Sequence, residues 1–464
     1  MTRIALHVRS LLVIAGAVAC HSAPAPVRSA PPAPVSPAPP VAAADPKPIV
    51  DGDVVDAHVR GIHVLVKRVA GAEEVATGLF IDGGARGWDA RTAGIEKLAL
   101  AVATNGGTKT LDKDRFTQKL SDLGSTIRSD SNDDYSEIVA WSLKPTWDET
   151  FTLVVETFRT PALPGAELEL QRQQHLVGLK HELEDPDRRL SILARQGMFK
   201  GHPYANRSVG TIESVSGFTA DQLADHLAKL RDTSRLLVVV VGDVEADHVI
   251  DSIGRALGDL PAGTTKLAPV PEVPVVAKGE VTIAPEKLPT NYIRAVFAGP
   301  RWNDPDFVVA RVAMTWLHNR EFEEVRTKRN LSYAPQAVYW WNVAAPLGWL
   351  YVTAVDPRAT MKVMLDEAKK LRDDKMNEHD LVAMKASVVT EAYLDAEAPE
   401  GQAKLLASAQ LRGGDWHFVR TFPDRVKAVT ADQVQAWAQK AITHLHTFVI
   451  GDAQKIDKQA LEQF

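Results

Sequence analysis

Residues 215–222 read VSGFTADQ, and residues 426–433 read VKAVTADQ. The apolar run that ends in VGD at residues 241–243 also returns, ending in IGD at residues 450–452. The first pair is offset by 211 residues and the second by 209, so two separate matches agree on one period. A solenoid would need shorter and more numerous units. The repeat therefore predicts a duplicated domain.

Length and composition agree with two domains. The 464 residues are 45% hydrophobic and 24% charged, which is normal for a soluble globular protein. Two domains of roughly 200 residues are the default expectation for this length. A stretch with four prolines separates two halves of similar size. We expect an N-terminal domain over residues 48–258, a linker over 259–278 and a C-terminal domain over 279–464.

The local patterns indicate mixed helix and sheet. Short β-rich runs and longer helical patterns follow one another without a regular strand-helix alternation, which favours α+β layers with helices packed on a largely antiparallel sheet. We therefore expect two homologous α/β-sandwich domains in a bilobed arrangement. The strand candidates are residues 63–82, 138–143 and 236–241, and the helix candidates are residues 93–103, 165–184 and the segment after Thr219.

The first 20 residues are typical of an export signal. Arg3 and Arg9 precede an apolar run over residues 11–19, which is too short to span a bilayer. Cys20 follows the small residues Ala-Val-Ala and resembles a bacterial lipoprotein cleavage site, where the thiol becomes acylated. Residues 21–47 are almost entirely Ala, Pro, Ser and Val, which predicts a disordered tether. We expect an outer-membrane lipoprotein on the periplasmic side of a bacterial envelope; the alternative is a simple secreted protein.

Several function classes are disfavoured by the residues present. A net charge of -6 and a pI near 6.2 give no basic footprint for nucleic acid, which is not expected as a partner. The chain has no Gly-x-Ser-x-Gly motif, no phosphate loop and, with Cys20 acylated, no free thiol. His175 and His181 are six residues apart, so a helix would turn them to different faces. His444 and His446 can share a strand face, but no carboxylate motif accompanies them.

One string in the second half carries a family resemblance. Residues 322–334 read FEEVRTKRNLSYA, with Arg326 followed seven positions later by Tyr333. This resembles the insulinase/pitrilysin family of inverted-zincin metallopeptidases, in which an acidic, aliphatic turn precedes the same Arg/Tyr pair. The GHPY segment at residues 201–204 and the VVGD strand ending at Asp243 agree in order, and the similarity covers roughly residues 50–455.

The resemblance also shows what this chain lacks. Active members of the family bind zinc through His-x-x-Glu-His on one helix and a glutamate on a second helix. The i, i+4 spacing turns both imidazoles toward the metal, and the Glu polarises the bound water. Here Lys97 and Ala101 stand at the two His positions, Leu100 at the Glu and Gly178 at the third ligand. A protonated lysine repels zinc and the other three side chains offer no donor, so no metal is expected in this chain.

Some members of the family divide the work between two chains, and this sequence resembles the chain without zinc ligands. The resemblance implies a non-catalytic subunit paired with a homologous zinc-bearing subunit, with no peptidase activity in the isolated chain. Tyr333 would donate a hydrogen bond to the developing oxyanion, and Arg326 would hold a carbonyl of the peptide substrate. The peptide would bind partly by adding a strand to an exposed sheet edge.

Two points stay open. Residues 314–321 read MTWLHNRE, whereas active relatives often have a small, Gly-rich sequence there, and this difference leaves the substrate preference undetermined. The alternative function is a catalytically silent structural or peptide-binding envelope protein, comparable to the core subunits of this family in respiratory complexes. A self-sufficient peptidase would require zinc in the isolated chain, which the substitutions at Lys97, Leu100 and Ala101 argue against.

Overall fold

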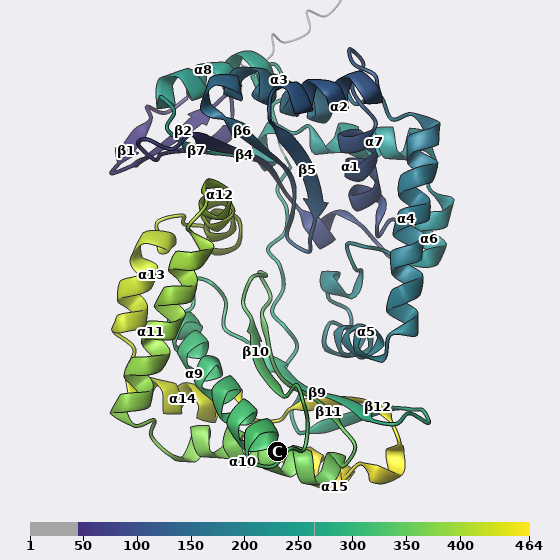
Figure 1. Ribbon diagram of the computed structural model, residues 1–464, viewed down its shortest axis with the longest axis vertical. Coiled ribbons are helices and arrows are strands. Elements are labelled where there is room, and N and C mark those ends of the chain that lie inside the picture. Colours follow the sequence, from purple (N-terminus) through teal and green to yellow (C-terminus); the bar gives the residue numbers. More distant parts are fainter. Residues whose placement is uncertain (1–44, 264) are drawn as a thin grey trace, which may run out of the picture. The chain divides into compact units, whose positions relative to one another are not determined.

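A computed structural model describes residues 45–263 and 265–464, which form two sheet-containing lobes (Figure 1). We call residues 45–257 the N-lobe and residues 280–464 the C-lobe. Between them, residues 258–263 and 265–279 form no helix or strand. The two mixed lobes confirm the α+β prediction. The predicted signal segment, Cys20 and the tether up to residue 44 lie outside the described residues.

The N-lobe contains one sheet in the order β1-β2-β3-β7-β4-β6-β5. All neighbouring strands run antiparallel except β3 and β7, which are parallel. The central strand β7 reads LLVVVVG and is buried along its whole length, as expected for a strand covered on both faces. The strands are β1 (Ile49–Asp51), β2 (Val54–Val59), β3 (Ile62–Arg68), β4 (Glu74–Asp82), β5 (Thr126–Ser131), β6 (Tyr135–Leu143) and β7 (Leu236–Gly242).

One face of this sheet is covered by helices of the same lobe, among them α1, α3 and α8 (Figure 1). Their apolar faces and the sheet enclose a single large core. The helices are α1 (Ile95–Asn105), α2 (Lys113–Asp122), α3 (Trp147–Arg159), α4 (Gly165–Glu184), α5 (Pro186–Met198), α6 (Ile212–Gly217), α7 (Ala220–Leu230) and α8 (Ala246–Leu257).

The C-lobe repeats this plan with a five-stranded sheet in the order β10-β11-β9-β12-β8. Its strands are β8 (Glu280–Pro285), β9 (Asn291–Ala298), β10 (Gln336–Trp340), β11 (Leu347–Ala354) and β12 (His446–Gly451). Its helices are α9 (Asp306–Glu321), α10 (Pro357–Asp373), α11 (Glu378–Asp395), α12 (Pro399–Ser408), α13 (Phe418–Lys427), α14 (Ala431–Ala441) and α15 (Lys458–Glu462). Two π-helical turns, Phe322–Thr327 and Ala409–Gly413, follow α9 and α12.

The sequence repeat encodes a helix start followed by a buried strand. The side chain of Thr219 accepts a hydrogen bond from the backbone N–H of Gln222, whose side chain accepts one from the N–H of Thr219 at 2.9 Å. Thr430 and Gln433 form the same reciprocal cap, also with a 2.9 Å return bond. The capped helices α7 and α14 then lead to the strands β7 and β12. The repeat thus fixes where the same helix begins in each lobe.

Each sheet has its second face covered by a helix of the other lobe. Helix α12 of the C-lobe packs on β4 and β7, where Leu406 and Trp416 join the buried side chains of the N-lobe sheet. Helix α5 of the N-lobe packs on β9 and β12, where Leu190 and Met198 contact the C-lobe sheet. The sequence pattern does not predict this exchange, because apolar periodicity shows that a face is buried but not which element covers it.

Polar contacts fix the two lobes to each other. The guanidinium of Arg412 donates to the Asp134 carboxylate at 2.7 Å, and that of Arg420 donates to Asp53 at 2.7 Å. Arg128 forms an ion pair with Glu400, also at 2.7 Å.

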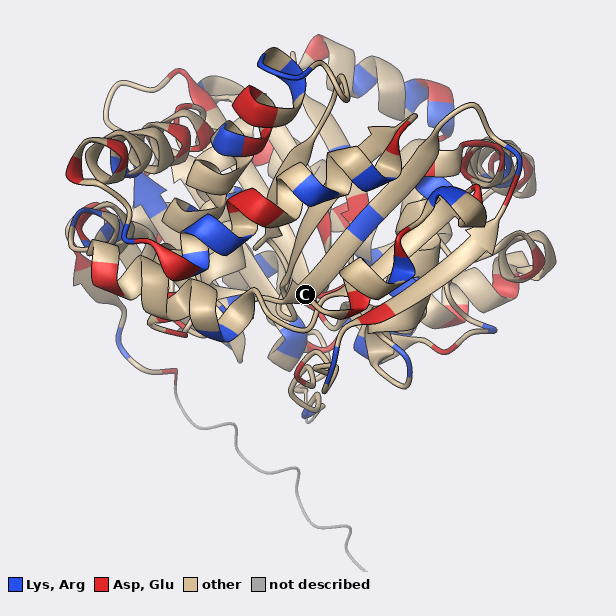
Figure 2. Ribbon diagram, turned by 90° about the horizontal axis from the view of Figure 1, so that it is seen from below, with Lys and Arg blue, Asp and Glu red and all other residues tan. Residues whose placement is uncertain are grey.

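Lys and Arg alternate with Asp and Glu along the helices (Figure 2). Of the helices that the structure describes, none is long and apolar enough to cross a bilayer.

Candidate functional site

The positions that hold zinc in active members surround one small pocket. Lys97 and Ala101 on α1 and Gly178 on α4 line a cavity of about 310 Å³, which we call the Lys97 pocket. Leu100 does not line it, because its side chain is 1% exposed and packs in the N-lobe core. The structure therefore brings together three of the four positions that the sequence singled out.

The donors around the Lys97 pocket do not fit a zinc ion. The ammonium of Lys97 forms an ion pair with Asp130 on β5, and Ala101 and Gly178 offer no donor atom. His175 also lines the pocket, but its Nε2 lies 2.8 Å from the carbonyl oxygen of Val209. Burial lowers the pKa of His175. Across the described ranges, no three His, Cys, Asp or Glu side chains are placed to hold a metal. We derive no chemical step through zinc at this pocket.

His444 and His446 do not share a strand face in the structure. His446 lies in β12, and its Nε2 is 2.9 Å from the Thr282 hydroxyl. His444 precedes that strand with a left-handed backbone, at a φ of 54°. The expectation that the two share a strand face is wrong, because the strand begins only at His446.

Arg326 and Tyr333 form one exposed cluster on the C-lobe. Arg326 belongs to the π-helical turn Phe322–Thr327, and Tyr333 lies shortly before β10. The guanidinium carbon of Arg326 is 4.0 Å from the ring centroid of Tyr333 and 4.6 Å from that of Phe322. Such distances are within the range of cation–π attraction. Tyr333 is 77% exposed, so most of its side chain is open to a second molecule although Arg326 lies on its ring.

The structure does not bring this cluster to the Lys97 pocket. Neither Arg326 nor Tyr333 lines that pocket or any of three described cavities to which both lobes contribute residues. The Arg326–Tyr333 cluster and the positions that the resemblance assigns to zinc ligands are therefore separate in the described residues.

A buried carboxylate holds the turn that carries Arg326. The Glu324 side chain accepts hydrogen bonds from Arg320 at 2.8 Å, from Lys328 at 2.7 Å and from Arg329. The hydrogen bond from Lys328 and that from Arg329 lower the pKa of Glu324 to about 2. Sequence reasoning did not single out Glu324, although an acid four residues before Lys328 on a helix is a recognisable pairing signal.

Glu321 lies directly before this turn in an unusual environment. Its side chain is fully buried, and neither carboxyl oxygen has a hydrogen-bond partner among the described residues. Burial, and to a lesser extent the charge of Glu367, raises the pKa of Glu321 well above its usual value. A carboxyl group in such a site holds its proton.

The bulky segment before the motif is part of the C-lobe interior. Met314 and Leu317 are buried in the C-lobe core, and the indole N–H of Trp316 donates to Asp380 at 3.0 Å. The residues that replace the small, Gly-rich sequence of active relatives therefore stabilise α9 and its neighbours. This placement gives their bulk a structural role.

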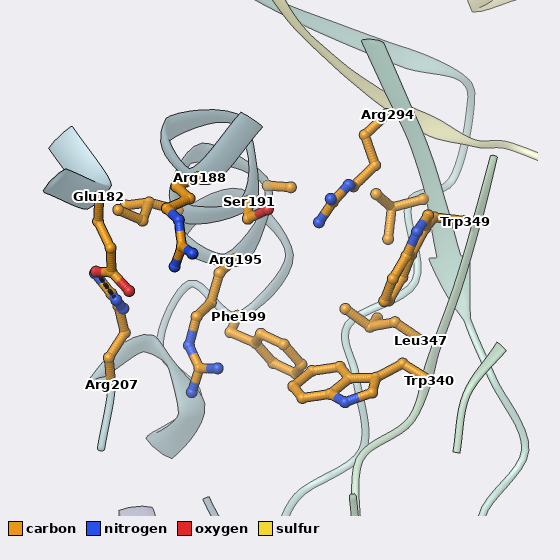
Figure 3. A pocket seen from close by; sticks show the side chains of 13 residues that line it. Glu182, Arg188, Ser191, Arg195, Phe199, Arg207, Arg294, Trp340, Leu347 and Trp349 are labelled. Carbon is orange, nitrogen blue, oxygen red and sulfur yellow. Dashed lines mark hydrogen bonds and ion pairs between the residues drawn. The ribbon is translucent and has the colours of Figure 1, made fainter. Parts of the chain in front are cut away.

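Sequence reasoning missed a second cavity, where α5 of the N-lobe meets the C-lobe sheet (Figure 3). Its volume is about 310 Å³, and four arginines line it together with aromatic side chains. No motif marks these residues. They come from helix α5, from the loop near Arg207 and from strands of the C-lobe, and only the folded chain brings them together.

Comparisons with known proteins find similarity to peptidase-related chains. Residues 217–388 match the family described as the peptidase M16 inactive domain. The non-peptidase homolog YmxG of Helicobacter pylori is 30% identical over 185 residues, 40% of this chain and 43% of that protein. The mitochondrial-processing peptidase subunit beta of Saccharomyces cerevisiae is 19% identical over 266 residues, 56% of each chain. The chain thus spans about half the length of these two curated relatives.

A solved structure shares the fold. The peptidase M16 inactive domain from Pseudomonas fluorescens superposes with a TM-score of 0.76 at 18% identity, covering 86% of this chain and 98% of that one. Residues 217–388 are therefore similar to an M16 inactive domain, and the described part of the chain shares the fold of a solved domain of that description. In this chain the positions that the resemblance assigns to zinc ligands carry Lys97, Ala101 and Gly178.

Proposed function

We propose that this chain is the non-catalytic subunit of a two-chain zinc metallopeptidase that cleaves peptides. One observation carries the proposal: the Arg326–Tyr333 cluster is complete and exposed, whereas the zinc-ligand positions of the same chain offer no ligands. Zinc, the attacking water and the general base would come from a homologous partner subunit. In this arrangement the isolated chain has no peptidase activity.

The exposed cluster suits a role on a substrate held by the partner. The Tyr333 hydroxyl would donate a hydrogen bond to the oxygen that becomes negative in the transition state, and Arg326 would donate to a substrate carbonyl. The cation–π contact uses the ring face and leaves the hydroxyl free for this bond. Aromatic and arginine side chains are also enriched at protein interfaces, which supports contact with a second chain.

The relatives support a paired arrangement in part. The Saccharomyces cerevisiae relative is named as a subunit of a processing peptidase, and the Helicobacter pylori relative is named as a non-peptidase. The first name supports a subunit role and the second supports the alternative, a silent structural or peptide-binding protein. The retained Arg326–Tyr333 cluster favours the subunit role, because a purely structural protein gains little from an exposed Tyr stacked on Arg.

The N-lobe offers an edge for a peptide substrate. Strand β5 (Thr126–Ser131) ends the sheet order, and its side chains alternate between exposed and more buried positions. Asp130 on this strand is the residue that pairs with Lys97, so the edge runs beside the Lys97 pocket. We propose that an extended peptide adds to β5 as a further strand, which recognises backbone more than sequence.

We also propose a periplasmic location with a lipid on Cys20, most simply in the outer membrane. The proposal rests on the residue pattern around Cys20. Replacement Cys20→Ser should move the protein from the membrane fraction to the soluble fraction and abolish labelling by a fatty-acid analogue. Retention of both the label and the membrane location in the variant would contradict lipidation at Cys20.

Co-purification tests the subunit role. The tagged, membrane-extracted protein is isolated from its native host, and zinc content and peptidase activity are measured on the complex and on this chain alone. We expect a stoichiometric His-x-x-Glu-His chain that holds the zinc, and activity only in the complex. Recovery of the chain alone, zinc-free and inactive, would favour the structural or peptide-binding alternative. Zinc in the isolated chain would overturn our interpretation of the Lys97 pocket.

A further inference from the structure

The second cavity, which we call the Arg294 cavity, is built from both lobes (Figure 3). Helix α5 supplies Arg188 and Arg195, and strand β9 supplies Arg294. Trp340 at the end of β10 and Trp349 on β11 form apolar walls. A pocket of about 310 Å³ is at the lower end of the usual range for ligand sites.

Most charges around the Arg294 cavity are already paired. Arg195 makes two hydrogen bonds to the Asp133 carboxylate, at 2.6 and 3.0 Å, and Arg207 is paired with Glu182. Arg188 is largely exposed and lies 3.6 Å from Asp185. The charges of Arg195 and Arg207 are thus already balanced by carboxylates of the chain. An anionic ligand would have to pair with another arginine of the cavity.

Arg294 differs from the other three arginines. Among the described residues no carboxylate lies within 4.0 Å of its guanidinium, and its buried Nε has no hydrogen-bond partner. Its guanidinium carbon lies 4.9 Å from the ring centroid of Trp349 and 5.6 Å from that of Tyr351. The guanidinium is directed into the cavity (Figure 3). Asp187 is near enough to act on the pKa of Arg294, but it accepts the hydrogen bond of Tyr351.

A half-buried guanidinium without an ion-pair partner is unfavourable, since the charge has lost part of its water without gaining a direct contact to a carboxylate. Burial accordingly lowers the pKa of Arg294. The planar fork of an arginine matches a carboxylate in a two-point hydrogen bond. The indole walls beside it would cover an apolar group attached to that carboxylate. The cavity thus combines an unpaired cation with an apolar wall at the same place.

We propose that the Arg294 cavity binds a carboxylate carried on an apolar or aromatic group. The C-terminal residue of a peptide and a free small aromatic acid share this chemistry. The carboxylate accepts two hydrogen bonds from Arg294, and the apolar group packs against the wall that Trp340 and Trp349 form together. The site lies within one chain and needs no partner subunit. A failure to bind the carboxylate would therefore not count against the proposed subunit role, and a failure of the subunit role would not count against this site.

Calorimetric titration of the purified full-length chain tests this site. The probes are N-acetyl-Ala-Ala-Phe with a free C-terminal carboxylate, the same peptide as its C-terminal amide, and 3-phenylpropionate. We expect the free acid to bind at least about tenfold more tightly than the amide, because hydrogen bonds to a charged group are lost in the amide. Binding of 3-phenylpropionate equal to that of the peptide acid would identify a small-acid site; much tighter binding of the peptide acid would identify a peptide-terminus site.

Variants separate the site from a general charge effect. Arg294→Met should abolish the preference for the acid, whereas Arg358→Met, an arginine in α10 that donates to the Gln454 carbonyl oxygen, should retain it. Arg294→Lys keeps the positive charge but lacks the planar guanidinium that can donate two hydrogen bonds. It should keep the fold and weaken binding of the acid. This variant provides the test if Arg294→Met does not fold. Equal binding of acid and amide, no binding of any probe at millimolar concentration, or an acid preference that persists without Arg294 would each overturn the proposal.

Discussion

Arg326 and Tyr333 are held by each other more than by the rest of the chain. The guanidinium lies on the exposed ring, and Tyr333 is 77% exposed. A cation–π contact at an exposed site is worth about 0.5–1 kcal/mol. The pair therefore adds little to the stability of the fold, and its presence needs a reason other than folding.

The stability of the cluster variants checks this interpretation. Arg326→Ala and Tyr333→Phe should each change the free energy of unfolding by less than about 1 kcal/mol, because surface substitutions away from buried networks have small effects. Urea unfolding followed by circular dichroism measures this change. A loss of about 2 kcal/mol or more in either variant would show that the cluster is structural and would weaken the case for its catalytic use.

Glu321 gives a pH-dependent prediction. Its pKa is raised well above 4.5 in the folded chain, so the folded state holds a proton that the unfolded state releases. Its contribution to stability is complete below pH 4.5 and is lost as the pH rises toward the folded pKa. Relative to the non-ionising variant Glu321→Gln, the wild type should lose about 1.4 kcal/mol for each pH unit in that window.

Urea unfolding at several pH values between 4.5 and 8 measures this difference. Glu323→Gln is the matched control, because Glu323 is a partly exposed neighbour in the same segment. The control should follow the wild type with no comparable drift. Parallel stability curves for the wild type and Glu321→Gln would show that Glu321 is ionised in the folded chain.

At the scale of elements, the π-helical turn depends on Glu324. The pKa of Glu324 is lowered to about 2, so its contribution to stability is present above pH 4.5 and is lost as the pH falls from 4.5 toward 2. Glu324→Gln should therefore loosen the turn at neutral pH, and hydrogen exchange of the backbone amides of residues 325–331 should become faster. Glu323→Gln again serves as control, and equal exchange in the two variants would contradict a special role for Glu324.

The helices and strands show what sequence patterns can predict. The expected helix over residues 165–184 has the same bounds as α4, and the expected strands correspond to β3, β4, β6 and β7. Local periodicity and capping residues carry that information. The π-helical turn at Phe322–Thr327 was not predictable, because its extra residue per turn is stabilised by packing and by the Glu324 network. The exchange of α5 and α12 is likewise decided by tertiary packing.

At the scale of the whole chain, Asp134 joins the two lobes. It accepts hydrogen bonds from Arg412 at 2.7 Å and from the Tyr204 hydroxyl, and it faces the backbone N–H of Ala344 at 3.2 Å. Arg412 is almost fully buried. Asp134→Ala should lower the free energy of unfolding by about 3–5 kcal/mol, because it leaves a buried cation without its partner.

The melting temperature and urea midpoint measure this loss. The control is Glu400→Ala, which removes ion pairs with Arg128 and Lys404 that are more exposed than the Asp134–Arg412 pair and should have an effect of about 1 kcal/mol or less. Equal effects of the two substitutions would show that burial of the Asp134–Arg412 pair does not distinguish it from a surface pair.

The arrangement of the lobes was only partly predictable. The repeat at residues 215–222 and 426–433 predicts two related lobes, and the substitutions at Lys97 and Gly178 predict an incomplete zinc site. The Arg294 cavity could not be foreseen, since Arg294 is one polar residue in the alternating pattern of β9 and its neighbours come from both lobes. Long-range placement of single charged residues leaves no local signal.

The central claim is that Tyr333 and Arg326 act on a substrate held at the zinc of another chain. Its most direct test is kcat/KM of the purified two-chain complex with wild-type protein, with Tyr333→Phe and with Tyr393→Phe, the last being a similarly exposed tyrosine of the same lobe. The account predicts a loss of about 100-fold or more for Tyr333→Phe with zinc content unchanged, and full activity for Tyr393→Phe. Equal kcat/KM for all three complexes would contradict it.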